Sequence, residues 1–119
     1  MTSFRVDVPA DPRWLHVPRT VVVTAAGRLE NASDLADLSL VLDEATLAVA
    51  TAPGVTGVSV NGTTGPESIA VDVVGTGRDI DHQDDGIDLL TVALDTLAPG
   101  HTVVRSSHEY RISLRFGDR

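Results

Sequence analysis

The chain contains neither cysteine nor lysine, and aromatic residues make up only 3% of its 119 positions. Without cysteine it cannot form a disulfide, use a thiolate as a nucleophile or build a cysteine metal site. Nine arginines supply all of the basic charge, against 17 acidic residues, for a net charge of −8. Binding to nucleic acid needs clustered basic side chains that neutralise phosphates, so this balance argues against DNA contact and suits a basic protein partner.

Long hydrophobic runs are also missing. The longest, residues 20–26, is interrupted by Thr24 and is far shorter than the about 18 apolar residues that a membrane helix needs. The first residues, Met-Thr-Ser-Phe-Arg-Val-Asp, have neither the basic start nor the apolar segment of a secretory signal. We therefore expect a cytoplasmic protein without a membrane partner.

What is present is typical of one globular domain over residues 1–119, with 42% hydrophobic residues. Helical spacing predicts a first helix within 13–29, a second from Asn31 or Ser33 to Pro53-Gly54, and a third over 85–97. Alternation predicts five strands, near 4–9, 55–60, 69–74, 103–106 and 110–116. This order indicates an α+β fold: a two-layer sandwich whose mixed, mostly antiparallel sheet is covered on one face by helices.

Three local features sharpen these boundaries. Asp11 followed by Pro12 is a favourable helix start, while Pro18 either kinks the first helix or moves its true start to near Val17. The turn-rich stretch 61–66, Asn-Gly-Thr-Thr-Gly-Pro, predicts the loop of a hairpin. In the second helix, apolar residues at three- and four-residue steps predict one core-facing stripe, made of Leu35, Leu38, Leu42, Ala45 and Val49.

The second helix also carries an adjacent acid pair, in the run Leu42-Asp43-Glu44-Ala45. This run resembles the N box of the Bergerat-type (GHKL) ATPases, in the RsbW/SpoIIAB branch of serine-kinase anti-sigma factors. The resemblance implies the histidine-kinase-like ATPase fold and places the family's general base at Glu44. The family's magnesium-holding Asn falls on Ala48, and Asp43 is expected to face solvent.

A second box departs from the family in the same way. Where the family has Asp-x-Gly-x-Gly after a strand, this chain has Gly75-Thr76-Gly77-Arg78-Asp79. The family's Asp reads the adenine amino group, and Gly75 has no side chain to do so. Asp79 replaces the last glycine and would face phosphates with a negative charge. We predict that the fold is kept without a nucleotide or metal cofactor, which leaves Glu44 as a vestigial, inactive general base.

Partner recognition is expected on the first helix. Arg19 is similar in position to an arginine with which the family contacts both the sigma factor and its antagonist. Arg13 and Trp14 lie nearby, and Arg and Trp are enriched among interface anchors. The resemblance therefore implies a sigma factor, a STAS-domain anti-anti-sigma factor or both as partners, and leaves a homodimer open.

The remaining groups of polar residues are explained by structural roles rather than by metal binding or catalysis. The acidic stretch 79–88 does not fit an EF-hand, which needs Gly where Asp84 stands and Glu where Leu90 stands, so we expect a solvated loop. The four histidines show no metal-ligand spacing. Ser106 and Ser107 beside His108 are typical of a turn between strands rather than of a catalytic pair.

Three functions stay open at the level of sequence. The first is an anti-sigma-factor-like binding module that sequesters its partner and is released by a STAS-type antagonist. The second is a weakly active serine/threonine kinase of the RsbW type that uses Glu44 on that antagonist. The third is a STAS antagonist itself, although the expected Asp-Ser phosphoacceptor turn is absent from the chain.

Overall fold

The computed structural model describes residues 2–28, 32–82 and 89–117, without the side chains of residues 28, 32 and 33. Two short 3₁₀ turns, Pro12–Trp14 and Ala26–Arg28, flank the first helix. In chain order the helices and strands are β1 (Thr2–Pro9), α1 (His16–Ala25), α2 (Ala32–Thr51), β2 (Val55–Thr64), β3 (Ser68–Gly77), α3 (Leu89–Leu97), β4 (Thr102–Arg105) and β5 (Glu109–Gly117).

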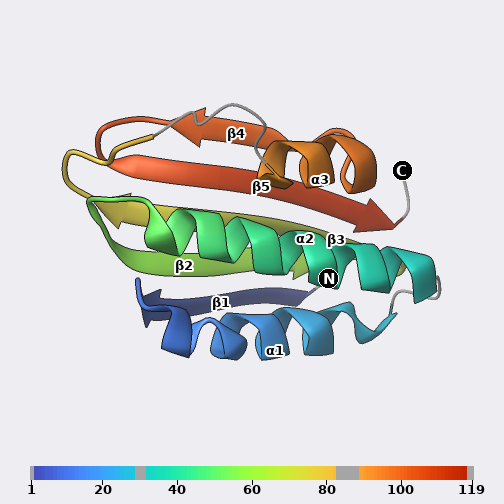
Figure 1. Cartoon of the computed structure of the whole chain (residues 1–119). Coiled ribbons are helices and arrows are strands. Elements are labelled where there is room, and N and C mark those ends of the chain that lie inside the picture. The colour runs from blue at the N-terminus through green and yellow to red at the C-terminus, as the bar shows by residue number, and fades with distance from the viewer. Residues whose placement is uncertain (1, 29–31, 83–88, 118–119) are drawn as a thin grey trace.

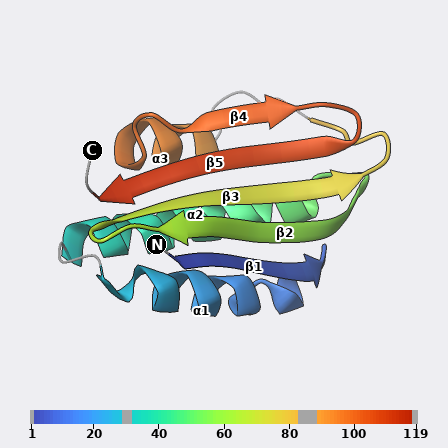
Figure 2. The same cartoon turned by 180° about the vertical axis from the view of Figure 1, so that it is seen from behind.

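The five strands form one sheet in the order β1-β2-β3-β5-β4, and every described pair of neighbours is antiparallel. The described helices lie on one side of this sheet (Figure 1), and none of them lies on the opposite face (Figure 2). The predicted α+β two-layer sandwich is confirmed, with a sheet that is wholly antiparallel rather than mixed in its described part. None of the described helices combines the length and apolar character needed to cross a bilayer.

The long helix α2 supplies most of the helical side of the core. Four residues of the predicted stripe, Leu38, Leu42, Ala45 and Val49, are fully buried, and Leu35 is partly buried. They pack on the inward side chains of the central strands, which include Val60, Val71, Val73, Ile112 and Phe116. Amphipathic spacing therefore placed this helix correctly.

The start of α1 resolves the question raised by Pro18. Asp11 caps the turn Pro12–Trp14, and its Oδ1 accepts a hydrogen bond of 3.0 Å from the backbone N–H of Arg13. The α-helix proper begins at His16, so Pro18 lies in its first turn, where a backbone N–H has no helical partner to lose. The alternative of a helix start near Val17 is therefore confirmed to within one residue, and no kink is needed. In α2, Ser33 lies inside the helix and cannot be its cap, while Asn31 is outside the described residues.

The predicted hairpin is confirmed, but its loop is shorter than the predicted 61–66. Residues 61–64 continue β2 and pair with β3, from Asn61 opposite Asp72 to Thr64 opposite Ile69. A short turn at 65–67 follows, in which the N–H of Gly65 donates to the carbonyl of Ser68 at 2.9 Å. Strand pairing outweighs the local preference of these residues for a turn, because each of them gains a cross-strand partner. The structure likewise extends β3 to Gly77, so both box glycines belong to a strand.

Candidate functional site

Gly75 lies on β3 beneath α2, at the position where the resemblance requires an adenine-reading Asp. The residue is buried, and a Cβ atom built there would lie 2.5 Å from Cγ1 of Val49 and 3.1 Å from a methyl of Val55. Such a distance is well inside van der Waals contact, so no side chain fits without movement of the core. Hydrophobic methyl groups therefore occupy the space that a side chain at this position would need.

Gly77, the second glycine of this box, also has no room for a side chain. A Cβ atom on Gly77 would collide with the backbone carbonyl of Gly54, in the turn after α2. Asp79, in the place of the family's last glycine, has a positive φ of 49° and an exposed side chain. A positive φ is uncommon for a residue other than glycine, although Asp tolerates it better than most. The chain thus leaves β3 by a backbone path that keeps close to the α2–β2 turn.

Residues 78–82, called the strap below, join two turns at one end of the sheet. On one side the N–H groups of Arg78 and Asp81 donate to the carbonyls of Gly54 and Pro53, at 3.1 and 2.9 Å. On the other side Ile80 donates to the carbonyl of Ser107 at 3.0 Å, and its side chain is buried. The expected solvated loop is therefore bonded to the fold on both sides over 79–82, and its remainder, with Asp84 and Asp85, lies outside the described residues.

His82 fixes the end of the strap over β5. Its Nε2 lies 2.7 Å from the carbonyl oxygen of Ser106, so this ring nitrogen is the donor. The ring also meets the buried Tyr110 edge to face, with centroids 5.0 Å apart. The guanidinium of Arg105 lies 5.6 Å from the same tyrosine centroid. An aromatic pair of this geometry adds stabilisation beyond the area that it buries.

The residues at the N-box positions lie on α2. Glu44 and Ala48 are both half-buried. Their neighbour Asp43 forms an ion pair with Arg19 of α1, at 3.4 Å between Oδ1 and Nε, with side chains 43% and 54% exposed. Asp43 was expected to face solvent, and 43% of its side chain is exposed; the structure adds an ion pair with Arg19, the residue predicted to bind a partner.

The other two predicted partner residues lie just before α1. Arg13 donates to Oδ2 of Asp11 at 2.7 Å while most of its side chain stays exposed. The side chain of Arg13, and then its backbone N–H, lower the pKa of Asp11 below its ordinary value. Trp14 is 47% exposed, which is uncommon for so large an apolar side chain. Their role in partner binding stays a prediction.

Sequence reasoning missed the open face of the sheet. Two shallow hollows there, of about 360 and 320 Å³, share Ala70 and Asp72. The alternating polar positions of the strands were the available signal, since cross-strand pairing aligns Asn61, Asp72 and Ser113 in one row.

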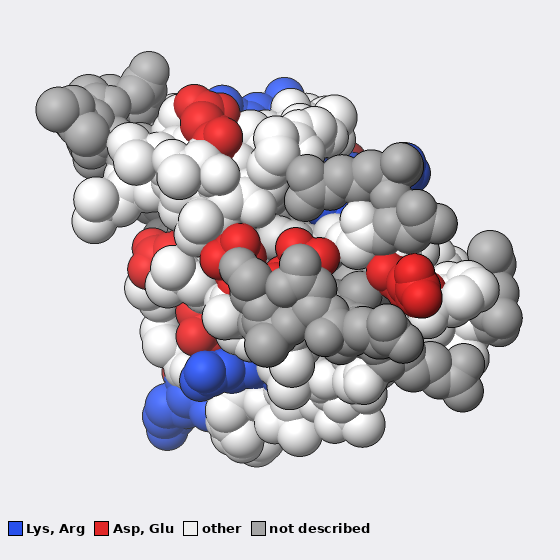
Figure 3. All heavy atoms as spheres, turned by 90° about the vertical axis from the view of Figure 1, so that its right-hand side faces the viewer, with Lys and Arg blue, Asp and Glu red and all other residues white. Residues whose placement is uncertain are grey.

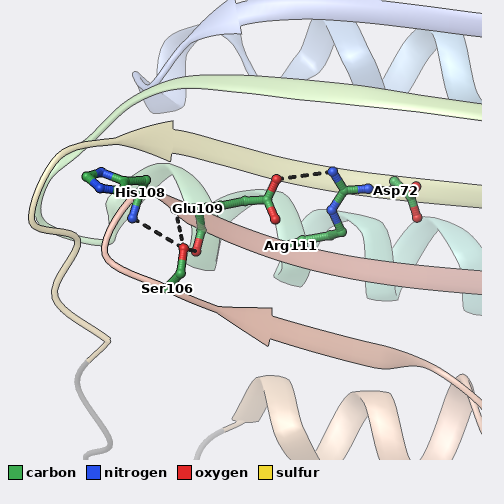
Figure 4. Close-up of polar contacts among 5 residues, drawn as sticks. All are labelled: Asp72, Ser106, His108, Glu109 and Arg111. Atoms are coloured by element: carbon green, nitrogen blue, oxygen red, sulfur yellow. Dashed lines mark hydrogen bonds and ion pairs between the residues drawn. The ribbon is translucent and has the colours of Figure 1, made fainter.

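Nearby, Arg111 forms ion pairs with Asp72 at 3.4 Å and with Glu109 at 3.1 Å (Figure 4). The hydrogen bond to Glu109 raises the pKa of Arg111, which keeps the guanidinium charged.

The serine and histidine at the β4–β5 turn have structural roles. Oγ of Ser106 accepts hydrogen bonds from the backbone N–H groups of His108 and Glu109, at 3.3 and 3.0 Å (Figure 4). This is turn chemistry, as predicted, because the contact to His108 involves its backbone and not its ring. In the part of the chain that the structure describes, no three His, Asp or Glu side chains converge to hold a metal ion.

Comparison with protein-family models gives no match, and no curated protein is significantly similar to the chain. The resemblance to anti-sigma factors therefore rests on the motifs of the sequence. The order of helices and strands agrees with that resemblance, but such an order is shared by many sandwiches and carries less weight than the two boxes.

Proposed function

We propose that this chain is a regulatory protein-binding module that resembles an anti-sigma factor of the RsbW/SpoIIAB type. It sequesters a sigma factor or a related partner in the cytoplasm, without ATP-dependent phosphorylation, and a STAS-domain antagonist releases it. The observation that supports this function best is the packing at Gly75. Methyl groups of Val49 and Val55 fill the place of the adenine-reading carboxylate.

The alternative function, a weakly active kinase, would need more than a general base at Glu44. Phosphoryl transfer depends on a metal and on a phosphate held in line, and a general base adds to that arrangement without replacing it. Ala48 offers no metal ligand, and Gly75 offers no contact to adenine. Glu44 alone therefore supports a vestigial base.

Arg19 suits recognition because its present pairing is weak. An ion pair between half-exposed side chains contributes only about 0 to 1 kcal/mol to stability. A carboxylate on a partner can therefore replace Asp43 at small cost, while the planar guanidinium still forms two parallel hydrogen bonds. Arg13 and Trp14, at the entry to the same helix, extend this surface with the residue types that anchor interfaces.

A capture experiment with matched baits tests this function. The wild-type chain, Arg19→Ala and Glu44→Ala are immobilised, and proteins retained from native cytoplasm are quantified by mass spectrometry. We expect a sigma factor or a STAS protein with the wild type and with Glu44→Ala, and its loss with Arg19→Ala. The Arg19→Ala chain should keep its free energy of unfolding within about 1 kcal/mol, so that its loss of binding is not a loss of fold.

Two outcomes would replace this function. Retention of the partner by Arg19→Ala together with its loss from Glu44→Ala would move recognition from α1 to the N box. Transfer of labelled phosphate from ATP to a captured STAS protein, abolished in Glu44→Ala, would establish the kinase instead.

A further inference from the structure

The solvent side of the helical layer carries most of the exposed apolar side chains of the described residues. Six large hydrophobic residues are exposed among the described residues, and four of them belong to α2 and α3. Leu40 and Leu47 stand seven positions apart on α2, and Leu89 and Val92 stand three apart on α3, so each pair occupies one side of its helix. These four residues define the α2–α3 face.

The two halves of this face point in the same direction. Helix α2 packs on the central strands and against α3, and both helices cover the same side of the sheet (Figure 1). The inward sides of the helices are occupied by core residues, such as Leu42 on α2 and Leu94 on α3. The exposed pairs therefore lie on the side that faces away from the sheet.

The charge around this face has one sign. Helix α2 contains four acidic residues and α3 contains one, five in all, and neither helix contains arginine. Among the described residues, Arg19 of α1 pairs with Asp43. At the end of the molecule where α2 begins, acidic side chains gather across the middle while the arginines lie toward the margins (Figure 3). The acids of α2 include Asp34 and Asp37 in this region.

We propose that the α2–α3 face docks an amphipathic helix of a protein partner, with apolar residues on one side and arginines or lysines at its margins. Apolar side chains would cover Leu40, Leu47, Leu89 and Val92, as helices do when they lie in a hydrophobic groove. Basic side chains would meet the acids of α2 and α3, which speeds association and makes it dependent on salt. This docking depends on the proposed protein-binding function and adds a second surface to that of α1.

Charge complementarity favours a basic helix over the other possible occupants of the α2–α3 face. A second copy of the chain would bring acidic helices against acidic helices, and like charges at an interface are unfavourable. Nucleic acid and anionic lipid are repelled for the same reason. A basic helix is the occupant whose charge complements the face.

The test uses a labelled model peptide of about five helical turns, with leucines along one side and arginines at its margins. Fluorescence anisotropy follows its binding to the full chain at low and at high salt. A peptide of the same composition with its leucines scrambled around the helix is the first control. We expect the amphipathic peptide to bind, the scrambled one to bind at least about tenfold more weakly, and high salt to weaken both.

Matched variants locate the site. The double variant Leu40→Ser/Leu47→Ser should weaken peptide binding about tenfold or more, because it removes half of the apolar face. Val104→Ser removes a similarly exposed side chain, 48% against 53% for Leu40 and 44% for Leu47, from the edge strand β4 and should change binding less than about twofold. Circular dichroism and thermal midpoints establish that every variant is folded, and amide shifts in NMR spectra should map the peptide to α2 and α3.

Three results would overturn this docking: no binding of the amphipathic peptide, equal binding of the scrambled peptide, or equal weakening by Val104→Ser. The outcome is separate from that of the capture experiment. Loss of partner capture in Arg19→Ala with no peptide binding would leave the proposed function standing without this second surface. Peptide binding with unchanged capture in Arg19→Ala would keep the α2–α3 face and remove α1 from recognition.

Discussion

At the scale of single residues, Gly75 shows how a missing side chain becomes part of a core. Val49 and Val55 approach Gly75 so closely that a Cβ atom does not fit there without a shift of the core. Glycine is here a packing residue on a regular strand, and its conformational freedom is not used. Restoring the family residue would therefore damage the fold before it could restore a site.

We expect Gly75→Ala to lower the free energy of unfolding by about 1 to 3 kcal/mol, the usual cost of overpacking a core, and Gly75→Asp to cost more because it also buries a charge. Gly27→Ala is the matched control, since nothing lies within 4 Å of a Cβ there; it should be neutral or stabilise by up to about 1 kcal/mol. Urea unfolding of the three variants provides the measurement. Equal stability of Gly75→Ala and the wild type would show that the helix and sheet pack less closely at this point.

The cap at Asp11 predicts a pH dependence. Its pKa is lowered from the ordinary value of 3.8, first by the side chain of Arg13 and then by the backbone N–H of Arg13. A carboxyl with a depressed folded-state pKa stabilises the fold above its unfolded value and loses that contribution as pH falls through the folded value. Asp11→Asn keeps a capping oxygen but cannot titrate. We expect the thermal midpoint of the wild type to exceed that of Asp11→Asn at neutral pH, and the difference to shrink below about pH 4. A difference that is independent of pH would contradict this.

At the scale of elements, the two sides of α2 differ in their burial. One side is fully buried against the sheet, and the other exposes Leu40 and Leu47 beside Glu44. The strap has a similar division, since its backbone is bonded to two turns while Asp79 faces solvent. Stability and the proposed recognition would therefore depend on different residues of the same element, and substitutions can separate them.

Leu42→Ala should cost about 2 to 5 kcal/mol, because Leu42 is 0% exposed and its truncation leaves a cavity in the core. Leu40→Ala, two positions away and 53% exposed, should change stability by less than about 0.5 kcal/mol. Chemical unfolding of both variants measures the contrast. A loss below about 1 kcal/mol for Leu42→Ala would mean that α2 buries a different side.

At the scale of the whole molecule, the fold is an α+β two-layer sandwich, and the packing at Gly75 leaves no room for a side chain that could contact a nucleotide. We expect no heat of binding when the chain is titrated with ATP or ADP and magnesium at about millimolar concentration, since Ala48 offers no metal ligand and Gly75 no adenine contact. Ala48→Asn should not restore binding, because Val49 and Val55 still fill the adenine side. Micromolar affinity of the wild-type chain in calorimetry would reject this view and favour the kinase.

Short-range sequence patterns were sufficient to predict most of the helices and strands of this protein. Periodicity predicted the buried stripe of α2, alternation predicted the five strands, and Asp11 with Pro12 predicted the helix entry, because each depends on neighbours within one or two turns of chain. The α+β sandwich followed from the order of these elements. The same short range misled at 61–64, where turn-forming residues sit in a strand because β1 and β3 pair with them on both sides.

Only the tertiary structure decided what the candidate site became. Arg19 and Asp43 belong to different helices, and the packing of α1 against α2 brings them to 3.4 Å. Gly75 meets Val49 and Val55 because the sheet carries β3 beneath α2, and His82 reaches Ser106 across 24 positions of sequence. Contacts of this kind depend on the relative placement of whole elements, which side-chain packing sets and no local pattern encodes. The sequence by itself could therefore show the resemblance and the positions that depart from it, whereas only the folded chain shows that hydrophobic side chains pack against Gly75.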